Sequence, residues 1–554
     1  MKISVGAESF EALRQSGGYY VDKTELIYDL VNANNTVTLF TRPRRFGKTL
    51  TMSMLESFFD CSRESTAVFD GLEITEHTQF CKDWMNRYPV IFITFKDVEG
   101  ITFSTAFVKL RTLLAELCKK HKAIIEERLT DPDDIAYYKK LKAEEVDEAT
   151  IQNSLYFLTR ILSTIYDKPV ILLIDEYDVP LAKAQENGYY QEMLDIIRGM
   201  FSVGLKTNEY LKFGVVTGCL RISKESIFTG VNNFSSYSVL SEDFSDYFGF
   251  TDREVQRMLA EAGMGEKDEL IRSWYDGYVF GNSYVYCPWD VVSYVAALLR
   301  RPNAMPENYW KNTSGNGVLK TFISRKKFRV TRQFETLMNG GTIRKTIQDQ
   351  LTYDTMYKNE DSLWSVLLMT GYLTKADPDA VGTTIELKIP NQEIATIFQD
   401  TVADHFVENL NQVDQQALMD ALWSEDVSDA SKRLSNFLWK TISYNNYHED
   451  YYHAFLAGIF VGLGYEVETD KEHGNGRPDV LVIDDDNRRA MIIEAKKADT
   501  ETRTEYFADE AIDQIIKNRY WKGLDGFDKI LCYGVSFHKK TALVKELDMA
   551  TIER

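Results

Sequence analysis

Cysteines and long apolar runs are both scarce in this sequence, and each scarcity excludes a class of protein. The six cysteines are dispersed over 554 residues without a Cys-x-x-Cys pair. We therefore expect free thiols in a reducing cytoplasm and no structural zinc site. No apolar run approaches the ~20 residues that a membrane-spanning helix needs, and the first residues lack the apolar stretch of a signal peptide. The sequence therefore predicts a cytoplasmic protein with no membrane partner.

Apolar residues are nevertheless plentiful. Hydrophobic residues make up 44% and aromatic residues 13% of the chain, which excludes global disorder. We find no internal repeat and no low-complexity segment. A chain of 554 residues is long enough for about three domains. The net charge of −20 argues against a protein that coats nucleic acid in bulk.

Two carboxylates and a lysine are closely spaced near the C-terminus. The apolar residues 480–483 and the run 491–494, which ends in Glu494, predict two strands joined by a turn. Such a hairpin can bring Asp479 beside Glu494. Successive side chains of a strand point to opposite faces, so Glu494 and Lys496 share one face. Two carboxylates can hold Mg²⁺ or Mn²⁺ and a lysine can activate a water, which is equipment for hydrolysing a phosphodiester.

The same spacing also fits a surface hairpin with scattered charges. The apolar residues 491–493 run directly into Glu494, so this acid lies at the end of a buried strand, where unpaired charge is rare. Residues 474–477 can form a tight turn before the motif, and residues 509–520 have the pattern of an amphipathic helix. This context favours a metal site over a surface hairpin.

A candidate phosphate-binding loop lies near the N-terminus. A β-rich run at 36–41 leads into Arg42-Pro43-Arg44-Arg45-Phe46-Gly47-Lys48-Thr49, and a helical pattern follows. Strand, loop, Gly-Lys-Thr and helix is the layout of a P-loop, in which Lys48 would reach the β- and γ-phosphates and Thr49 the Mg²⁺. A standard P-loop has glycine where this chain has Arg42, and a basic turn before a helix is the alternative interpretation.

A second apolar strand supplies a candidate partner for this loop. Residues 169–174 are continuously apolar, as expected of a strand covered on both faces, and they lead into Asp175 and Glu176. An acidic pair at such a strand end suits a Walker B role. Asp175 would then lie in the Mg²⁺ shell and Glu176 would polarise the attacking water.

A third apolar strand is predicted at 213–216, before Thr217 and Arg221. Thr217 resembles a sensor residue that reads the γ-phosphate. Arg221 could stabilise charge in the transition state or serve as a salt-bridge partner, and the sequence does not choose between these roles.

The N-terminal region resembles the AAA-ATPase-like family over roughly residues 1–300. Loops of this family often read Arg-Pro-Arg-Arg-Phe-Gly-Lys-[Ser/Thr], as residues 42–49 do here. The resemblance implies catalysis by Glu176 and a set of ATP-binding residues, namely Arg45, Phe46, Gly47, Lys48, Thr49, Asp175, Thr217 and Arg221.

The C-terminal region, from about residue 441 to 554, resembles the PD-(D/E)XK nuclease superfamily. The shared features are Gly476-Arg477-Pro478-Asp479, Glu494-Ala495-Lys496, and Ala511 with Gln514-Ile515 and Tyr520. By this resemblance Asp479 and Glu494 bind metal and Lys496 assists the water. Gln514 supports the site. Glu449 or Glu472 could add a carboxylate, and the sequence does not choose between them.

A basic stripe interrupts the acidic chain at residues 300–345, where eleven Lys and Arg residues stand against two acids, with aromatic residues between them. A local basic stripe with planar side chains is what a groove for a nucleic-acid backbone requires. A solvated helix face balanced by acidic neighbours is the alternative. We expect nucleic acid as a partner, with DNA favoured, although these residues do not distinguish DNA from RNA.

Together these features predict an α/β protein with three parts. They are a P-loop NTPase core with a parallel sheet at 1–240, a helical lid and linker region at 241–440, and a PD-(D/E)XK α/β nuclease-like domain at 441–554. The expected function is ATP binding and hydrolysis coupled to cleavage of nucleic acid, with ATP and Mg²⁺ or Mn²⁺ as cofactors. The alternative is an ATP-dependent binding switch or scaffold with an inactive nuclease-like domain. The oligomeric state stays open, a homo-oligomer included.

Overall fold

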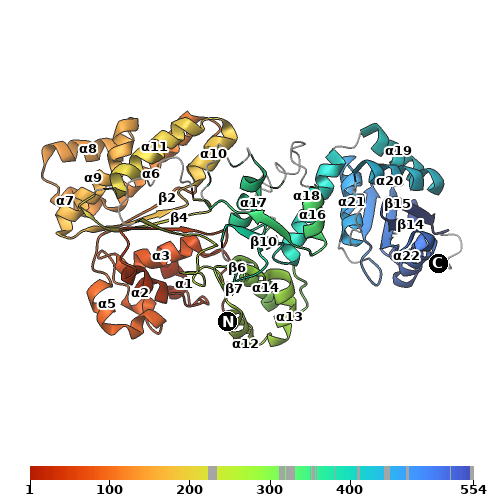
Figure 1. The fold of residues 1–554 in the computed structure, drawn as a ribbon, viewed down its shortest axis with the longest axis horizontal. Helices are drawn as coiled ribbons and strands as arrows, with labels where there is room; N and C mark the ends of the chain where they lie inside the picture. The colour runs from red at the N-terminus through yellow and green to blue at the C-terminus, as the bar shows by residue number, and fades with distance from the viewer. Residues whose placement is uncertain are drawn as a thin grey trace. The chain divides into compact units, whose positions relative to one another are not determined.

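A computed structural model of the chain gives two compact units (Figure 1). The first unit comprises Met1–Ser314 and Arg344–Glu393, and the second comprises Gly315–Ile343 and Ile394–Arg554. The structure describes residues 1–206, 208–221, 234–310, 319, 331–349, 351, 356, 359–380, 382–408, 412–441, 449–469, 473–524 and 526–548. Within these residues, no helix has the length and apolar character needed to cross a membrane.

A five-stranded parallel sheet forms the centre of the first unit. Its strands are β1 (Val37–Thr41), β2 (Val90–Thr94), β3 (Val170–Asp175), β4 (Leu211–Gly218) and β5 (Phe234–Tyr237). They are ordered β2-β3-β4-β1-β5, and every neighbouring pair is parallel. β3 is buried along its whole length, as its continuous apolar run predicts. The predicted P-loop core with a parallel sheet is confirmed, and the carboxyl ends of β1, β3 and β4 meet at one edge.

Helices cover both faces of this sheet. Figure 1 shows α1, α2, α3 and α5 on one face and α6, α8, α9, α10 and α11 on the other. The helices of this region are α1 (Phe10–Gln15), α2 (Glu25–Asn32), α3 (Lys48–Phe59), α4 (Thr66–Phe69), η1 (Glu73–Glu76), α5 (Thr78–Trp84), α6 (Phe103–Lys120), α7 (Lys122–Arg128), α8 (Pro132–Lys142), α9 (Glu148–Tyr166), α10 (Val179–Asn187) and α11 (Tyr190–Leu205).

The middle of the chain is largely helical, as expected. Thr251 is the N-cap of α12 and forms a capping box with Glu254, which fixes the start of this helix. The elements here are α12 (Asp252–Ala262), η2 (Gly265–Lys267), α13 (Asp268–Tyr275), β6 (Tyr278–Phe280), β7 (Ser283–Val285), α14 (Pro288–Arg300), α16 (Thr331–Met338), β8 (Ile343–Thr346), α17 (Glu360–Met369), β9 (Thr374–Lys375), β10 (Thr384–Lys388), α18 (Gln392–Glu408), α19 (Gln412–Trp423) and α20 (Val427–Thr441). β6 and β7 form a hairpin, and β8, β10 and β9 form a small sheet.

The second unit contains a mixed sheet ordered β11-β12-β13-β14-β15, in which only β13 and β14 are parallel. Its elements are α21 (Glu449–Gly462), β11 (Glu466–Glu468), β12 (Val480–Asp484), β13 (Arg489–Lys497), η3 (Glu501–Arg503), α22 (Thr504–Asn518), β14 (Lys529–His538) and β15 (Thr541–Glu546). The predicted hairpin is confirmed as β12 and β13. The predicted helix at 509–520 begins five residues earlier and ends at Asn518.

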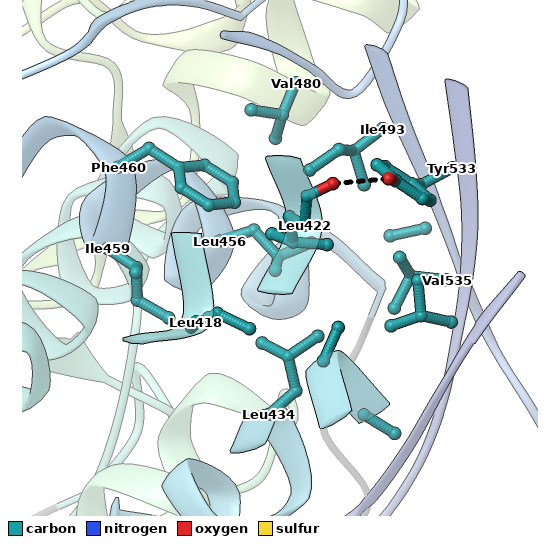
Figure 2. Close-up of a cluster of buried hydrophobic side chains, with 14 of the residues drawn as sticks. Leu418, Leu422, Leu434, Leu456, Ile459, Phe460, Val480, Ile493, Tyr533 and Val535 are labelled. Carbon is teal, nitrogen blue, oxygen red and sulfur yellow. Dashed lines mark hydrogen bonds between the residues drawn. The ribbon is translucent and has the colours of Figure 1, made fainter. Parts of the chain in front are cut away.

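Apolar side chains from α19, α20 and α21 pack against one face of this sheet to form a core (Figure 2). Leu418, Leu456 and Phe460 are buried there against strand residues such as Val480 and Val535. The hydroxyl of Tyr533 donates to the carbonyl of Leu422 at 2.6 Å, so this hydroxyl is paired within the core. This core fixes the position of α21 beside the strands that carry the predicted metal ligands.

Candidate nucleotide and metal sites

The phosphate loop connects the buried strand β1 to helix α3. Gly47 is the N-cap of α3 and has a φ of 80°, and Arg45 has a φ of 73°. A glycine tolerates this left-handed region, whereas an arginine rarely adopts it, so Arg45 is a strained position. Because glycine has no side chain, the first N–H groups of α3 are left to water or to a phosphate.

Asp175 is a buried carboxylate surrounded by hydroxyl donors. Thr49 Oγ1 donates to Asp175 Oδ2 at 2.8 Å, Thr94 Oγ1 donates to the same oxygen at 3.3 Å, and Thr217 Oγ1 donates to Oδ1 at 2.5 Å. Burial and the charge of Glu176 raise the pKa of Asp175, while the Thr217 and Thr49 hydroxyls lower it. The predicted residues of the loop, β3 and β4 therefore meet at one point. Thr49 and Asp175 supply hard oxygen atoms that suit Mg²⁺.

Lys48 is held against a carboxylate beside the loop. Its Nζ donates to the carbonyls of Arg42 at 3.2 Å and Pro43 at 3.0 Å, and lies 3.3 Å from Glu176 Oε1. Burial lowers the pKa of Lys48, but its acidic neighbours, with Cys219 and Glu176 foremost, more than offset this and raise the pKa above its ordinary value. The ammonium is therefore charged, and Glu176, the predicted water-polarising residue, is engaged by it.

Arg42 stands where a standard P-loop has glycine, and it is fully buried. Its guanidinium donates to the carbonyls of Tyr237 at 2.8 Å and Phe244 at 3.0 Å. It also lies over the rings of Phe248 and Phe280, where cation–π attraction compensates part of its lost hydration. Burial lowers the pKa of Arg42 to about 9, so it stays charged at neutral pH. The Arg42 side chain is thereby committed to the segment after β5 rather than to a phosphate.

A cavity of about 250 Å³ opens beside the loop. The Arg45 guanidinium lies 3.9 Å from the centroid of the Trp289 ring, and Phe46 is buried against Tyr278 and Phe280. Loop residues and aromatic residues line the cavity together, among them Gly47, Lys48, Thr49, Tyr19, Tyr20, Phe250 and Trp289. Backbone N–H groups, a lysine and planar rings fit a ligand that carries phosphate and a flat ring system.

The two predicted sensing residues have different environments. Thr217 is buried in β4 and bonds Asp175, close to the loop. Arg221 Nη1 lies 3.8 Å from Asp349 Oδ2, and its guanidinium lies over the ring of Phe234. Arg221 therefore has the salt-bridge environment of the alternative interpretation, and its role toward a nucleotide stays a prediction.

The C-terminal hairpin brings the two predicted metal ligands together. Asp479 directly precedes β12, and Glu494 lies in the antiparallel strand β13. The Ala495 N–H donates to Asp479 Oδ2 at 2.7 Å, and the Asp479 N–H makes a longer bond of 3.4 Å to Glu494 Oε2. Lys496 Nζ donates to Glu494 Oε1 at 3.2 Å. The acid–acid–lysine set expected from the spacing is thus assembled in space.

Glu494 is completely buried, which makes its negative charge costly. Burial and the neighbouring Asp479 raise the pKa of Glu494 to about 7, although Lys496 lowers it. A divalent cation between the two carboxylates would remove their repulsion. No group of three or more His, Cys, Asp and Glu residues within the described ranges could enclose a metal. Mg²⁺ often takes one or two carboxylates and completes its shell with water and phosphate, so the pair fits this ion.

Gln514 contacts this region indirectly. Its Nε2 donates to the hydroxyl of Tyr520 at 3.3 Å. A β-carbon at Gly476 would lie 3.2 Å from Tyr520, so Tyr520 packs closely against the turn that leads to Asp479. The predicted support by Gln514 would therefore act through Tyr520. Glu449 begins α21, and the other candidate acid, Glu472, lies outside the described residues.

Six of the eleven basic residues of the stripe lie outside the described residues, namely Lys311, Lys320, Arg325, Lys326, Lys327 and Arg329. Lys345, at the end of the stripe, is paired with Glu360 at 2.6 Å. Nucleic-acid binding by the stripe stays a prediction.

Asp178 and His453 are among the site residues that the sequence reasoning did not select. Asp178 Oδ2 accepts the N–H groups of Cys219 and Leu220, both at 3.0 Å, and so fixes the chain just after β4. Its place in the same acidic run as Asp175 was an available signal. His453 Nε2, on α21, lies 3.1 Å from Asp479 Oδ2. A single histidine on a largely apolar helix carries no comparable signal.

Comparison with known proteins agrees with both regions. Residues 4–228 match the model of a family described as predicted AAA-ATPase, and residues 447–547 match that of the PD-(D/E)XK nuclease superfamily. The chain thus combines an AAA-ATPase-like domain with a C-terminal domain of the PD-(D/E)XK nuclease superfamily, which confirms both resemblances. A protein of Azotobacter chroococcum mcd 1, named as an uncharacterized protein in the vnfD 5′ region, is 24% identical over 503 residues that cover 87% of each chain.

Proposed function

We propose that this protein binds and hydrolyses ATP and uses the nucleotide to control metal-dependent cleavage of nucleic acid, with DNA as the favoured substrate. The observation that carries the proposal is the presence of two assembled sites in one chain. In the first, Thr49 and Asp175 are 2.8 Å apart beside Lys48. In the second, the Asp479 N–H donates to Glu494 Oε2 at 3.4 Å, and Lys496 donates to the other oxygen of Glu494.

The nucleotide half of the proposal rests on the contact between Lys48 and Glu176. A phosphate would compete with Glu176 for the Lys48 ammonium, because a phosphate carries more negative charge than a carboxylate. Glu176, once released, would be available to orient and polarise a water. Thr49 and Asp175 would hold Mg²⁺, which when bound would neutralise phosphate charge. ATP binding would therefore free the Glu176 carboxylate for its predicted catalytic role.

The nuclease half rests on the carboxylate pair. Asp479 and Glu494 would hold Mg²⁺ or Mn²⁺, which when bound would stabilise negative charge developing on a phosphodiester. Lys496, 3.2 Å from Glu494, would help to orient a water and promote its deprotonation. The basic stripe at 300–345 supplies a candidate surface for the nucleic-acid backbone.

A cleavage assay with matched variants tests this proposal. Plasmid DNA, single-stranded DNA and RNA are incubated with the full chain, with Mg²⁺ or Mn²⁺, and with or without ATP. We expect metal-dependent cleavage that responds to ATP, that EDTA stops and that Asp479→Asn abolishes. Asp485→Asn changes an exposed acid on the neighbouring turn and should cut like the wild type. Cleavage that survives Asp479→Asn would overturn the nuclease assignment.

A binding switch or scaffold with an inactive nuclease-like domain is the second candidate. The pairing of Lys496 with the fully buried Glu494 favours it, because this pair can neutralise the site without a metal. Metal binding without cleavage, across all substrates and nucleotide states, would support this candidate.

A further inference from the structure

His453 connects helix α21 to the predicted metal ligand Asp479. Its Nε2 lies 3.1 Å from Asp479 Oδ2 and 3.3 Å from the carbonyl oxygen of Ala495. The Ala495 carbonyl accepts hydrogen bonds and cannot donate them, and the same is true of an ionised carboxylate. The hydrogen between these groups and the imidazole must therefore be on Nε2. The same Asp479 Oδ2 also accepts the Ala495 N–H at 2.7 Å. The Oδ2 atom of Asp479 therefore accepts one backbone N–H and lies within ion-pair distance of Nε2 of the imidazole, whose N–H also faces the Ala495 carbonyl.

The helix that presents His453 is fixed by its packing. The ring of Tyr452 stacks on Phe537 of β14 with centroids 4.3 Å apart and planes only 4° from parallel. Phe455 and Leu456 are fully buried in the core between α21 and the sheet. Because the neighbours of His453 on α21 are held by this packing, the imidazole has a fixed position beside β13.

This arrangement constrains the orientation of Asp479. A carboxylate whose Oδ2 accepts a backbone N–H and lies 3.1 Å from an imidazole nitrogen cannot rotate freely about its terminal torsion. Its Oδ1 is then the oxygen that can turn toward a cation shared with Glu494. Hydrogen bonds of this kind to a metal ligand typically change metal affinity by about 10- to 100-fold.

We propose that His453 is a positioning residue of the metal site, which holds Asp479 in the orientation that binds a divalent cation through Oδ1. This inference rests on the proposed metal site at Asp479 and Glu494. It differs from a purely structural role, in which His453 would only tie α21 to β13 through the Ala495 carbonyl. A structural tie would change the stability of the domain and leave the metal affinity of the folded protein unchanged.

Measuring the metal affinity of the full chain distinguishes the positioning role of His453 from a purely structural one. Mn²⁺ titrations by calorimetry, without nucleotide, compare the wild type with Asp479→Ala, His453→Ala and His453→Gln. Circular dichroism and thermal unfolding check that each variant is folded. The control is His538→Gln, because Nδ1 of His538 lies 3.1 Å from the carbonyl oxygen of Ala498, directly after β13, and so makes a comparable imidazole–carbonyl contact at another point of the same sheet.

We expect His453→Ala to weaken Mn²⁺ binding by about 10- to 100-fold. His453→Gln should recover much of this loss, because its amide N–H can replace the imidazole N–H as a donor. His538→Gln should bind like the wild type. If Asp479→Ala abolishes binding while folded His453→Ala and His453→Gln bind Mn²⁺ as the wild type does, the inference about His453 is overturned and the metal site stands. If Asp479→Ala also binds like the wild type, the metal site itself is wrong.

Discussion

Replacing Glu393 by glutamine should flatten the pH dependence of stability in the first unit. Glu393 and Asp290 are both fully buried, and the Trp310 N–H donates to Glu393 Oε1 at 2.8 Å. Burial and the charge of Asp290 raise the pKa of Glu393 to about 10, and burial raises the pKa of Asp290 to about 6. At pH values between these, the folded pair retains one proton, whereas both acids are ionised in the unfolded chain.

The sign and size of the effect follow from this proton. A raised carboxyl pKa means that the folded state binds more protons than the unfolded state, so stability is greatest at low pH and is lost as the pH rises toward the folded pKa. One proton changes the free energy of unfolding by about 1.4 kcal/mol per pH unit, so the pair should account for a loss of about 2 to 3 kcal/mol from pH 6 to 8. Glutamine at position 393 keeps the shape and the bond to Trp310 but removes this proton.

Unfolding of the full chain at pH 6, 7 and 8 provides the assay. The wild type is compared with Glu393→Gln and with Glu266→Gln, a change of an exposed acid. Stability of Glu393→Gln relative to the wild type should increase with pH, whereas Glu266→Gln should follow the wild type throughout. Parallel pH profiles for the wild type and Glu393→Gln would refute the shared proton.

Three further outcomes follow from the two sites. Lys48→Ala should abolish ATP binding or hydrolysis, whereas Glu176→Gln should bind ATP without releasing phosphate. Nucleotide titration measures the binding of each variant, and a phosphate-release assay measures its hydrolysis. Normal hydrolysis by Lys48→Ala would contradict the P-loop assignment. Arg42→Gly, although it restores a standard P-loop residue, should destabilise the first unit by about 3 kcal/mol because buried carbonyls lose their donor; an unchanged melting temperature would contradict this. Lys496→Ala should lose cleavage by orders of magnitude and keep Mn²⁺ affinity, since an ammonium does not bind Mg²⁺ or Mn²⁺, and lost affinity would show a different role.

Much of the fold and both candidate sites could be predicted because their signals are local. The continuous apolar run before Asp175 predicts a buried parallel strand, and β3 is one. Gly47, Lys48 and Thr49 stand at a strand-to-helix junction, where the P-loop pattern requires them. Asp479 and Glu494 are brought together by a hairpin, which is predicted by two short apolar runs separated by a turn.

Other features depend on contacts between distant parts of the chain, which no local pattern encodes. The sequence by itself determined which residues could meet a phosphate or a metal, because periodicity and turn chemistry act over a few residues. The tertiary structure alone decided that Arg42 is buried among carbonyls and aromatic rings, that Asp290 faces Glu393, and that His453 reaches Asp479. Each of these depends on the packing of helices and strands far apart in sequence, where burial and not spacing sets the partner of a charged group.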